Sequence, residues 1–153
     1  MKKLKLILFF LFINFGCLAL GIWLMGSGAT SDWYISLNKA PWTPPGWFFG
    51  VAWTSIMICF SIYLAQVFSK QKSTRLKLAF TIQVFLNVIW NYLFFNQHLV
   101  LFGLINILAL AVVIYYMFFG IKLNNKLVRY LLLPYMIWIL VATSLNAYIL
   151  IYN

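Results

Sequence analysis

Hydrophobic and polar residues alternate along the chain in blocks, and five of the blocks are long apolar stretches. They cover residues 6–25, 47–68, 78–95, 99–120 and 127–152. Each is close to the roughly 20 residues that an α-helix needs to cross a bilayer. The residue-by-residue alternation typical of a membrane β-barrel is absent from the sequence. The pattern predicts an all-α integral membrane protein, a bundle of five transmembrane helices that forms a single domain over residues 1–153.

Three of the four connections between these spans are short, and residues 26–46 form the long one. Ser31 is placed to N-cap a short helix over residues 32–38. Thr43 is placed to cap the second span, with Pro44 at its first position, where proline is tolerated. We therefore expect an ordered loop over one end of the bundle.

The same loop is rich in aromatic residues. Trp33 and Tyr34 fall in the expected short helix, and Trp42 and Trp47 lie close to the second span. One interpretation is an aromatic belt at the membrane interface. The other is a lid that closes a cavity between the helices. The loop is called the lid segment below.

The charged residues are few and uneven. Only 8% of the residues are charged, whereas a soluble domain has roughly 25%. Ten of the eleven basic residues fall at the N-terminus and in the second and fourth connections: Lys2, Lys3, Lys5, Lys70, Lys72, Arg75, Lys77, Lys122, Lys126 and Arg129. By the positive-inside rule, this places the N-terminus in the cytoplasm and the C-terminus outside. The net charge of +10 then needs no nucleic-acid partner. The first span, longer than the core of a signal peptide, is expected to be retained.

The single acidic residue, Asp32, restricts the chemistry. A pair of catalytic carboxylates needs two acids. Cys17, Cys59 and His98 are too scattered for a zinc site, so no metal and no cofactor is expected. The two cysteines lie in apolar stretches and are expected to be free thiols.

Tryptophans and amides occur deep within the spans. Trp53, Trp90 and Trp138 lie far from the interfacial depth that tryptophan usually prefers. Amides and small residues recur at helical spacing in the third and fifth spans: Gln83, Asn87, Asn91, Ala142 and Asn146. Such residues can join helices by interhelical hydrogen bonds. They can also line a cavity for a flat apolar ligand, and spacing alone leaves both interpretations open.

Three segments carry a family resemblance. Residues 40–47 read APWTPPGW and are followed by Gly50 and Trp53; residues 83–95 read QVFLNVIWNYLFF; residues 134–146 read PYMIWILVATSLN. They resemble the second, third and fifth helices of the TspO/translocator protein family, also called tryptophan-rich sensory proteins and peripheral benzodiazepine receptors. The three motifs occur in the family's order and cover nearly the whole chain.

The resemblance implies a membrane receptor or carrier, commonly a homodimer, that binds porphyrins such as protoporphyrin IX and heme-type tetrapyrroles. Benzodiazepine and isoquinoline-type drugs would bind in the same cavity. Positions matched to the family's motifs would contact the ligand: Trp33, Tyr34, Trp53, Asn87, Trp90, Asn91, Trp138, Ala142 and Asn146. Light- and oxygen-dependent porphyrin degradation, with Trp53 and Trp138 as the catalytic positions, is an alternative, and porphyrin export is another. The positive-inside pattern favours a bacterial inner membrane.

Two departures from the family are visible. Asn91 stands where the family often has serine, so one edge of the pocket is expected to differ. The family's C-terminal sterol motif ends in a basic residue, whereas no Lys or Arg follows Arg129 here. Sterol binding is therefore not expected.

Overall fold

In the computed structural model, which describes residues 2–71, 73–123 and 125–153, the chain is a bundle of long helices. The long helices are α1 (Lys2–Leu24), α3 (Gly46–Phe68), α4 (Thr74–Asn91), α5 (Val100–Phe119) and α6 (Leu133–Tyr152). Within the described residues, five helical stretches are long and apolar enough to cross a membrane. The prediction of an all-α bundle with five membrane-spanning helices is confirmed.

Four short elements complete the fold. A single 3-10 turn η1 (Gly28–Thr30) and the short helix α2 (Asp32–Ser36) lie in the lid segment. The π-helical segment η2 (Tyr92–Asn96) extends α4, and the 3-10 segment η3 (Lys126–Leu132) leads into α6. Short π-helical turns in helical segments are frequently found at functional sites.

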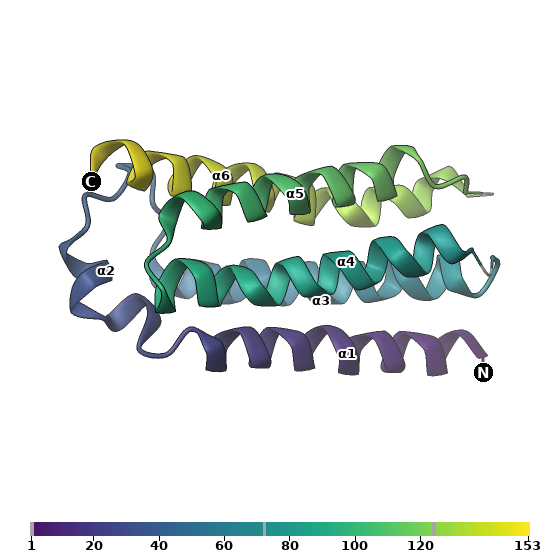
Figure 1. The fold of residues 1–153 in the computed structure, drawn as a ribbon. Coiled ribbons are helices and arrows are strands. Elements are labelled where there is room, and N and C mark those ends of the chain that lie inside the picture. Colours follow the sequence, from purple (N-terminus) through teal and green to yellow (C-terminus); the bar gives the residue numbers. More distant parts are fainter. Residues whose placement is uncertain (1, 72, 124) are drawn as a thin grey trace.

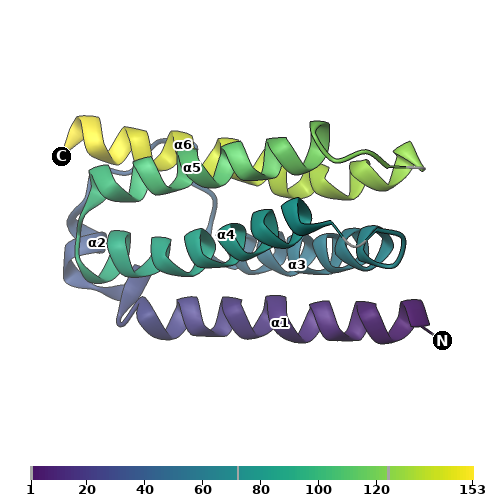
Figure 2. The same ribbon diagram turned by 45° about the vertical axis from the view of Figure 1, so that its right-hand side comes forward.

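The helices lie side by side in layers (Figures 1 and 2). α1 packs on one side against α3 and α4, and α5 packs against α4 and α6 on the other side. The N-terminus, the α3–α4 connection and the α5–η3 connection meet at one end of the bundle, whereas α2 and the C-terminus lie at the other (Figure 1). We call the first the basic end, because the three basic segments found in the sequence meet there; of their residues, Lys72 lies outside the described part of the chain. The cytoplasmic orientation of this end stays a prediction.

The core is built from apolar side chains that are completely enclosed, among them Phe60, Leu64 and Ile114. The hydroxyl of Tyr63 donates a hydrogen bond to the backbone carbonyl of Met117 at 2.8 Å. Large apolar side chains also cover the outside, as a helix surrounded by lipid requires. Polar contacts join helices inside this apolar shell.

Amide side chains make several of these contacts. Asn14 of α1 donates to the Ser61 hydroxyl of α3 at 2.8 Å, and Asn106 of α5 donates to the Leu86 carbonyl of α4 at 2.8 Å. Such bonds contribute on the order of 0.6 kcal/mol each in a membrane. These two amides therefore join neighbouring helices.

The caps of the lid segment agree only in part with the sequence. Ser31 caps α2 as predicted, since its hydroxyl oxygen accepts a hydrogen bond from the Tyr34 N–H at 3.2 Å. The predicted extent of the short helix to residue 38 was wrong, because Leu37 is already extended. The predicted cap at Thr43 was also wrong, because its hydroxyl donates to the Ala40 carbonyl within a turn.

The start of the second span differs for a steric reason. Pro44 was predicted as its first helical residue, but α3 begins at Gly46 and Pro45 is extended. A residue that precedes a proline is disfavoured in the helical region, so Pro44 cannot easily begin a helix before Pro45. Two consecutive prolines therefore delay the helix by two residues.

Candidate ligand-binding site

A small apolar cavity lies between α3, α4, α5 and α6. Its volume is about 40 Å³. Five of the residues predicted from the sequence to contact a ligand line it: Trp53, Asn87, Trp90, Trp138 and Ala142. The helices thus bring three indoles and one amide, from α3, α4 and α6, to a single cavity. Ligand pockets usually measure roughly 300–1,000 Å³, so this cavity is much smaller than a typical ligand pocket.

The α3 and α6 walls are aromatic. The ring centroids of Trp53 and Trp138 are 6.4 Å apart and their planes meet at 75°. Phe49, one helical turn before Trp53, meets Trp138 edge to face at 5.2 Å. A separation and angle of this kind belong to the favourable edge-to-face geometry. Flat π faces and an absence of charge among the described lining residues suit a flat apolar ligand.

Asn146 accepts a hydrogen bond from one of the indoles that line the cavity, that of Trp90. Its Oδ1 accepts a hydrogen bond from the Trp90 indole Nε1 at 3.4 Å, and its Nδ2 donates to the Val100 carbonyl at 3.0 Å. Asn146 is buried but does not line the cavity. Its contact with the site passes through Trp90.

A second polar pair lies one helical turn from Asn87. The Gln83 Nε2 of α4 donates to the Tyr135 hydroxyl of α6 at 2.9 Å, and the Tyr135 ring packs edge to face on Trp53 at 6.2 Å. The other amide atom, Gln83 Oε1, is buried and has no hydrogen-bond partner among the described residues. The pair joins α4 to α6 directly beside the aromatic wall.

The lid segment reaches the cavity through a stack of rings. Trp33 stacks on His98 with centroids 4.1 Å apart and contacts Phe94 edge to face at 5.6 Å. Phe94, in η2, stacks in turn on Trp90 at 5.1 Å. The predicted contact residue Trp33 therefore lies above the cavity and not in its wall.

Tyr34 is the second lid residue predicted to contact a ligand. The Tyr34 ring packs on Phe95 with ring centroids 5.2 Å apart. The Lys39 Nζ lies 4.7 Å from the centroid of the Tyr34 ring. Burial raises the pKa of its phenol, so the hydroxyl stays neutral. Like Trp33, it covers the site from outside.

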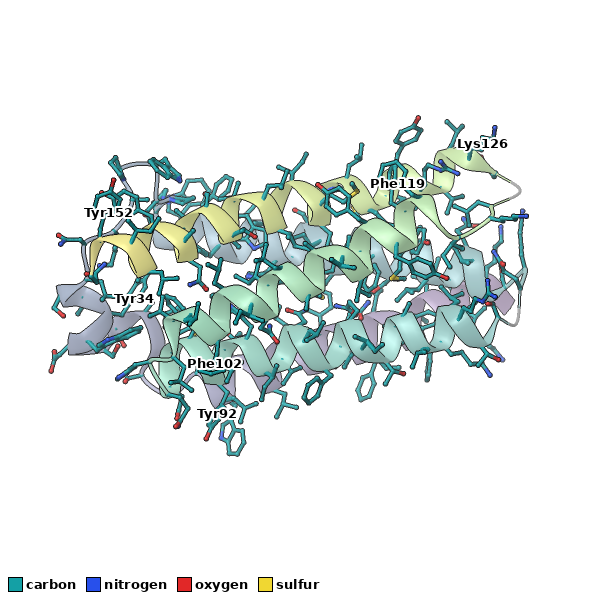
Figure 3. The ribbon with its side chains drawn as sticks, turned by 45° about the horizontal axis from the view of Figure 1, so that its top comes forward. Tyr34, Tyr92, Phe102, Phe119, Lys126 and Tyr152 are labelled. Atoms are coloured by element: carbon teal, nitrogen blue, oxygen red, sulfur yellow. The ribbon has the colours of Figure 1, made fainter. Side chains whose placement is uncertain are left out.

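α6 holds the other half of the lid segment. The Trp42 indole Nε1 donates to the Ser144 hydroxyl at 3.1 Å, and the Trp42 ring packs edge to face on Tyr148 at 5.5 Å. Figure 3 shows Tyr34 and Tyr152 at the same end of the bundle, opposite Lys126. The lid segment therefore spans the end of the bundle from η2 to α6.

Asn91 has a different environment. Its side chain lies against α1, where a Cβ added at Gly21 would come within 2.7 Å of its Nδ2. Asn91 follows Asn87 by four residues, a further rotation of about 40° around α4, and it is not among the residues that line the cavity. The structure therefore does not bring Asn91 to the cavity with Asn87.

Four lining residues were not singled out from the sequence: Phe49, Ile107, Leu110 and Ile139. Phe49 could have been found, because it precedes Trp53 by four residues on the same helix face. The others are ordinary apolar residues in apolar helices. Their position depends on how α5 and α6 are rotated in the bundle.

Comparison with known proteins agrees with this arrangement. A family model described as the TspO/MBR family matches residues 9–152. The chain belongs to the TspO/MBR family. It is 36% identical to the tryptophan-rich protein TspO of Archaeoglobus fulgidus over 127 residues, which cover 82% of each chain. It is 34% identical to the tryptophan-rich protein TspO of Chlorobaculum tepidum over 90% of each chain, and 33% identical to protein CrtK of Rhodobacter capsulatus over 74% of each. As a TspO/MBR family member with five candidate spans, the chain is a multi-pass membrane protein.

Proposed function

We propose that this TspO/MBR family member is a membrane receptor or carrier for porphyrins, such as protoporphyrin IX and heme-type tetrapyrroles. Benzodiazepine and isoquinoline-type ligands would occupy the same site. The observation that carries the proposal is the convergence of Trp53, Trp90 and Trp138 with Asn87 on one uncharged cavity. Indole faces stack on a flat ring system, and an amide adds one polar point for orientation.

Binding of a porphyrin requires the cavity to open, since about 40 Å³ is far too small for a tetrapyrrole. The parts that can yield are the lid segment and the indoles beneath it. Phe94 links the two, because it contacts Trp33 of the lid segment and stacks on Trp90 of the wall. Opening of the lid segment would thus free the Trp90 face, as lids do in other ligand sites.

The experiment is a titration of the purified protein with protoporphyrin IX, followed by the porphyrin's own absorbance and emission. Trp53→Phe/Trp138→Phe should bind about tenfold more weakly, because a phenyl ring offers less π surface than an indole at both positions and a full aromatic pair contributes roughly 0.5–1.5 kcal/mol. Trp23→Phe/Trp47→Phe is the matched control, since these indoles are 75% and 69% exposed. Equal affinities of the two double variants would refute the site.

A second candidate is light- and oxygen-dependent degradation of the bound porphyrin. It is favoured by the 6.4 Å separation of Trp53 and Trp138, two oxidisable rings that a bound porphyrin would touch together. Under illumination, wild type should then consume protoporphyrin IX faster than Trp53→Phe/Trp138→Phe at equal occupancy. Equal rates would leave a receptor or carrier, and porphyrin flux into liposomes would separate export from sensing.

A further inference from the structure

A second and larger hollow lies at the basic end of the bundle. Its volume is about 350 Å³, and it shares no lining residue with the tryptophan cavity. Residues from the start of α1, the end of α3 and the stretch just after it, and the segment from Lys122 into η3 line it. Six of its lining residues are charged or carry an amide: Lys3, Gln66, Lys70, Gln71, Lys122 and Asn125. Nothing in the proposed porphyrin function uses these residues.

Three lysines from distant parts of the sequence meet there. Lys3, Lys70 and Lys122 line the same hollow and are exposed. The one acidic residue of the sequence, Asp32, begins α2 at the opposite end of the bundle (Figure 1). No carboxylate side chain of the chain can therefore neutralise the three ammonium groups. Like charges held together in this way create a positive potential that attracts an anion.

The walls of the hollow are fixed by hydrogen bonds. The Gln71 side chain donates from Nε2 to the Lys122 carbonyl at 2.8 Å, which ties the α3–α4 connection to the α5–η3 connection. The Asn125 Oδ1 accepts from the Leu127 N–H at 3.0 Å and caps η3. The Lys122 backbone and the Asn125 side chain are thus held in place at the rim of the hollow.

The hollow lies where lipid headgroups would be. α3 ends at Phe68 and α5 ends at Phe119, and Lys70 and Lys122 follow these ends within three residues. A bilayer around the five spans would have its polar surface at this level. Ammonium groups bind phosphate oxygens as compact point charges, and amide N–H groups add donors.

We propose that this hollow binds a phosphate group, supplied by the headgroup of an anionic phospholipid from the surrounding membrane. The level of the hollow at the ends of the spans favours this source, and a soluble phosphate has the same chemistry. The site shares no lining residue with the tryptophan cavity, so this proposal can be confirmed or refuted independently of the porphyrin titration. Its occupant would join α1, α3 and the α5–η3 connection at the end of the bundle that lacks a lid segment.

The test compares two triple variants of equal charge in nanodiscs of phosphatidylcholine with and without phosphatidylglycerol. Lys3→Ala/Lys70→Ala/Lys122→Ala removes the charges of the hollow. Lys5→Ala/Lys77→Ala/Lys126→Ala removes three exposed lysines of the same end that do not line it. Native mass spectrometry counts retained phosphatidylglycerol, and thermal unfolding in neutral detergent shows that both variants fold.

Wild type and the control triple should retain phosphatidylglycerol, and the hollow triple should bind it about tenfold more weakly than the control. A parallel titration of the delipidated protein in detergent with inorganic phosphate separates the two sources. Stabilisation by phosphate that only the hollow triple loses, without preference for phosphatidylglycerol, would assign the site to a soluble phosphate. Equal binding by all three proteins, or equal losses in both triples, would overturn the proposal.

Discussion

The side-chain amide of Asn153 pairs with the backbone of Asn38 across the end of the bundle. Its Oδ1 accepts from the Asn38 N–H at 2.8 Å, and its Nδ2 donates to the Asn38 carbonyl at 3.2 Å. The Asn38 side chain donates back to the Tyr152 carbonyl at 3.3 Å. The end of α6 thereby holds the lid segment closed over the site.

Asn153→Ala should speed both association and dissociation of protoporphyrin IX. The substitution removes both side-chain hydrogen bonds to Asn38, and one to the Ile149 carbonyl within α6. Each bond to Asn38 has a net contribution of about 0.5–1.5 kcal/mol, so opening should become about tenfold more frequent. Stopped-flow measurement of porphyrin emission gives both rates. Ser36→Ala is the control, because that hydroxyl donates only to the Trp33 carbonyl within the lid segment. Identical rates for the two variants would show that Asn153 does not restrain the lid segment.

Asn146→Leu should weaken porphyrin binding as well as stability, because Trp90 loses the acceptor that orients its indole. Asn106→Leu removes a comparable interhelical amide bond, to the Leu86 carbonyl, but touches no indole of the site. Both should lower the free energy of unfolding by about 1 kcal/mol. Only Asn146→Leu should raise the porphyrin Kd; a parallel rise for Asn106→Leu would mean that general loosening is responsible.

Gly21→Ala should destabilise the bundle, whereas Gly16→Ala should not. A Cβ at Gly21 would come within 2.7 Å of the Asn91 Nδ2, while a Cβ at Gly16 meets nothing within 4 Å. Both substitutions raise helix propensity in α1 to a similar degree. Thermal unfolding should therefore separate them by about 1 kcal/mol, the low end of the cost of overpacking, because the crowded atom lies at the end of the Asn91 side chain. Equal stabilities would mean that Asn91 moves aside freely.

The spans were predictable because each depends on a local pattern. Residues 47–68 and 99–120 agree with α3 and α5 to within one residue at each end. The first and third spans begin four residues earlier than predicted, in α1 and α4. The last span differs because η3 precedes α6 and Pro134 lies in the first turn of α6. Proline clashes with the carbonyl four residues earlier, which prevents the α-helix from starting much before it.

The site was only partly predictable. Its tryptophans were predicted because tryptophan in membrane proteins usually lies at the interface, so an indole deep within a span suggested another role. The closing contacts of the lid segment could not be found, since Asn38 and Asn153 are 115 residues apart and their pairing depends on the whole fold. Likewise, the rotation that turns Asn91 toward Gly21 depends on where α1 packs.

The lid segment should open at alkaline pH. Burial raises the pKa of the Tyr34 phenol above its ordinary value of about 10. The closed state favours the neutral hydroxyl, so its stability is complete below pH 10 and is lost as the pH rises through the higher folded-state pKa. Porphyrin dissociation rates should therefore be constant from about pH 6 to 9 and rise above pH 10. Tyr34→Phe should remove that rise; an unchanged rise would assign it to another group.

Photo-oxidation mapped on each tryptophan tests the central claim, that the ligand lies in the cavity of Trp53 and Trp138. Protein with bound protoporphyrin IX is illuminated briefly, and peptide mass spectrometry measures oxidation of every tryptophan. A water-soluble sensitiser that does not bind gives the order set by exposure, with Trp23 and Trp47 first, at 75% and 69% exposed against 5% for Trp138. With bound porphyrin the order should invert, and Trp53 and Trp138 should be oxidised first. Oxidation that still begins at Trp23 and Trp47 would contradict a porphyrin site in this cavity.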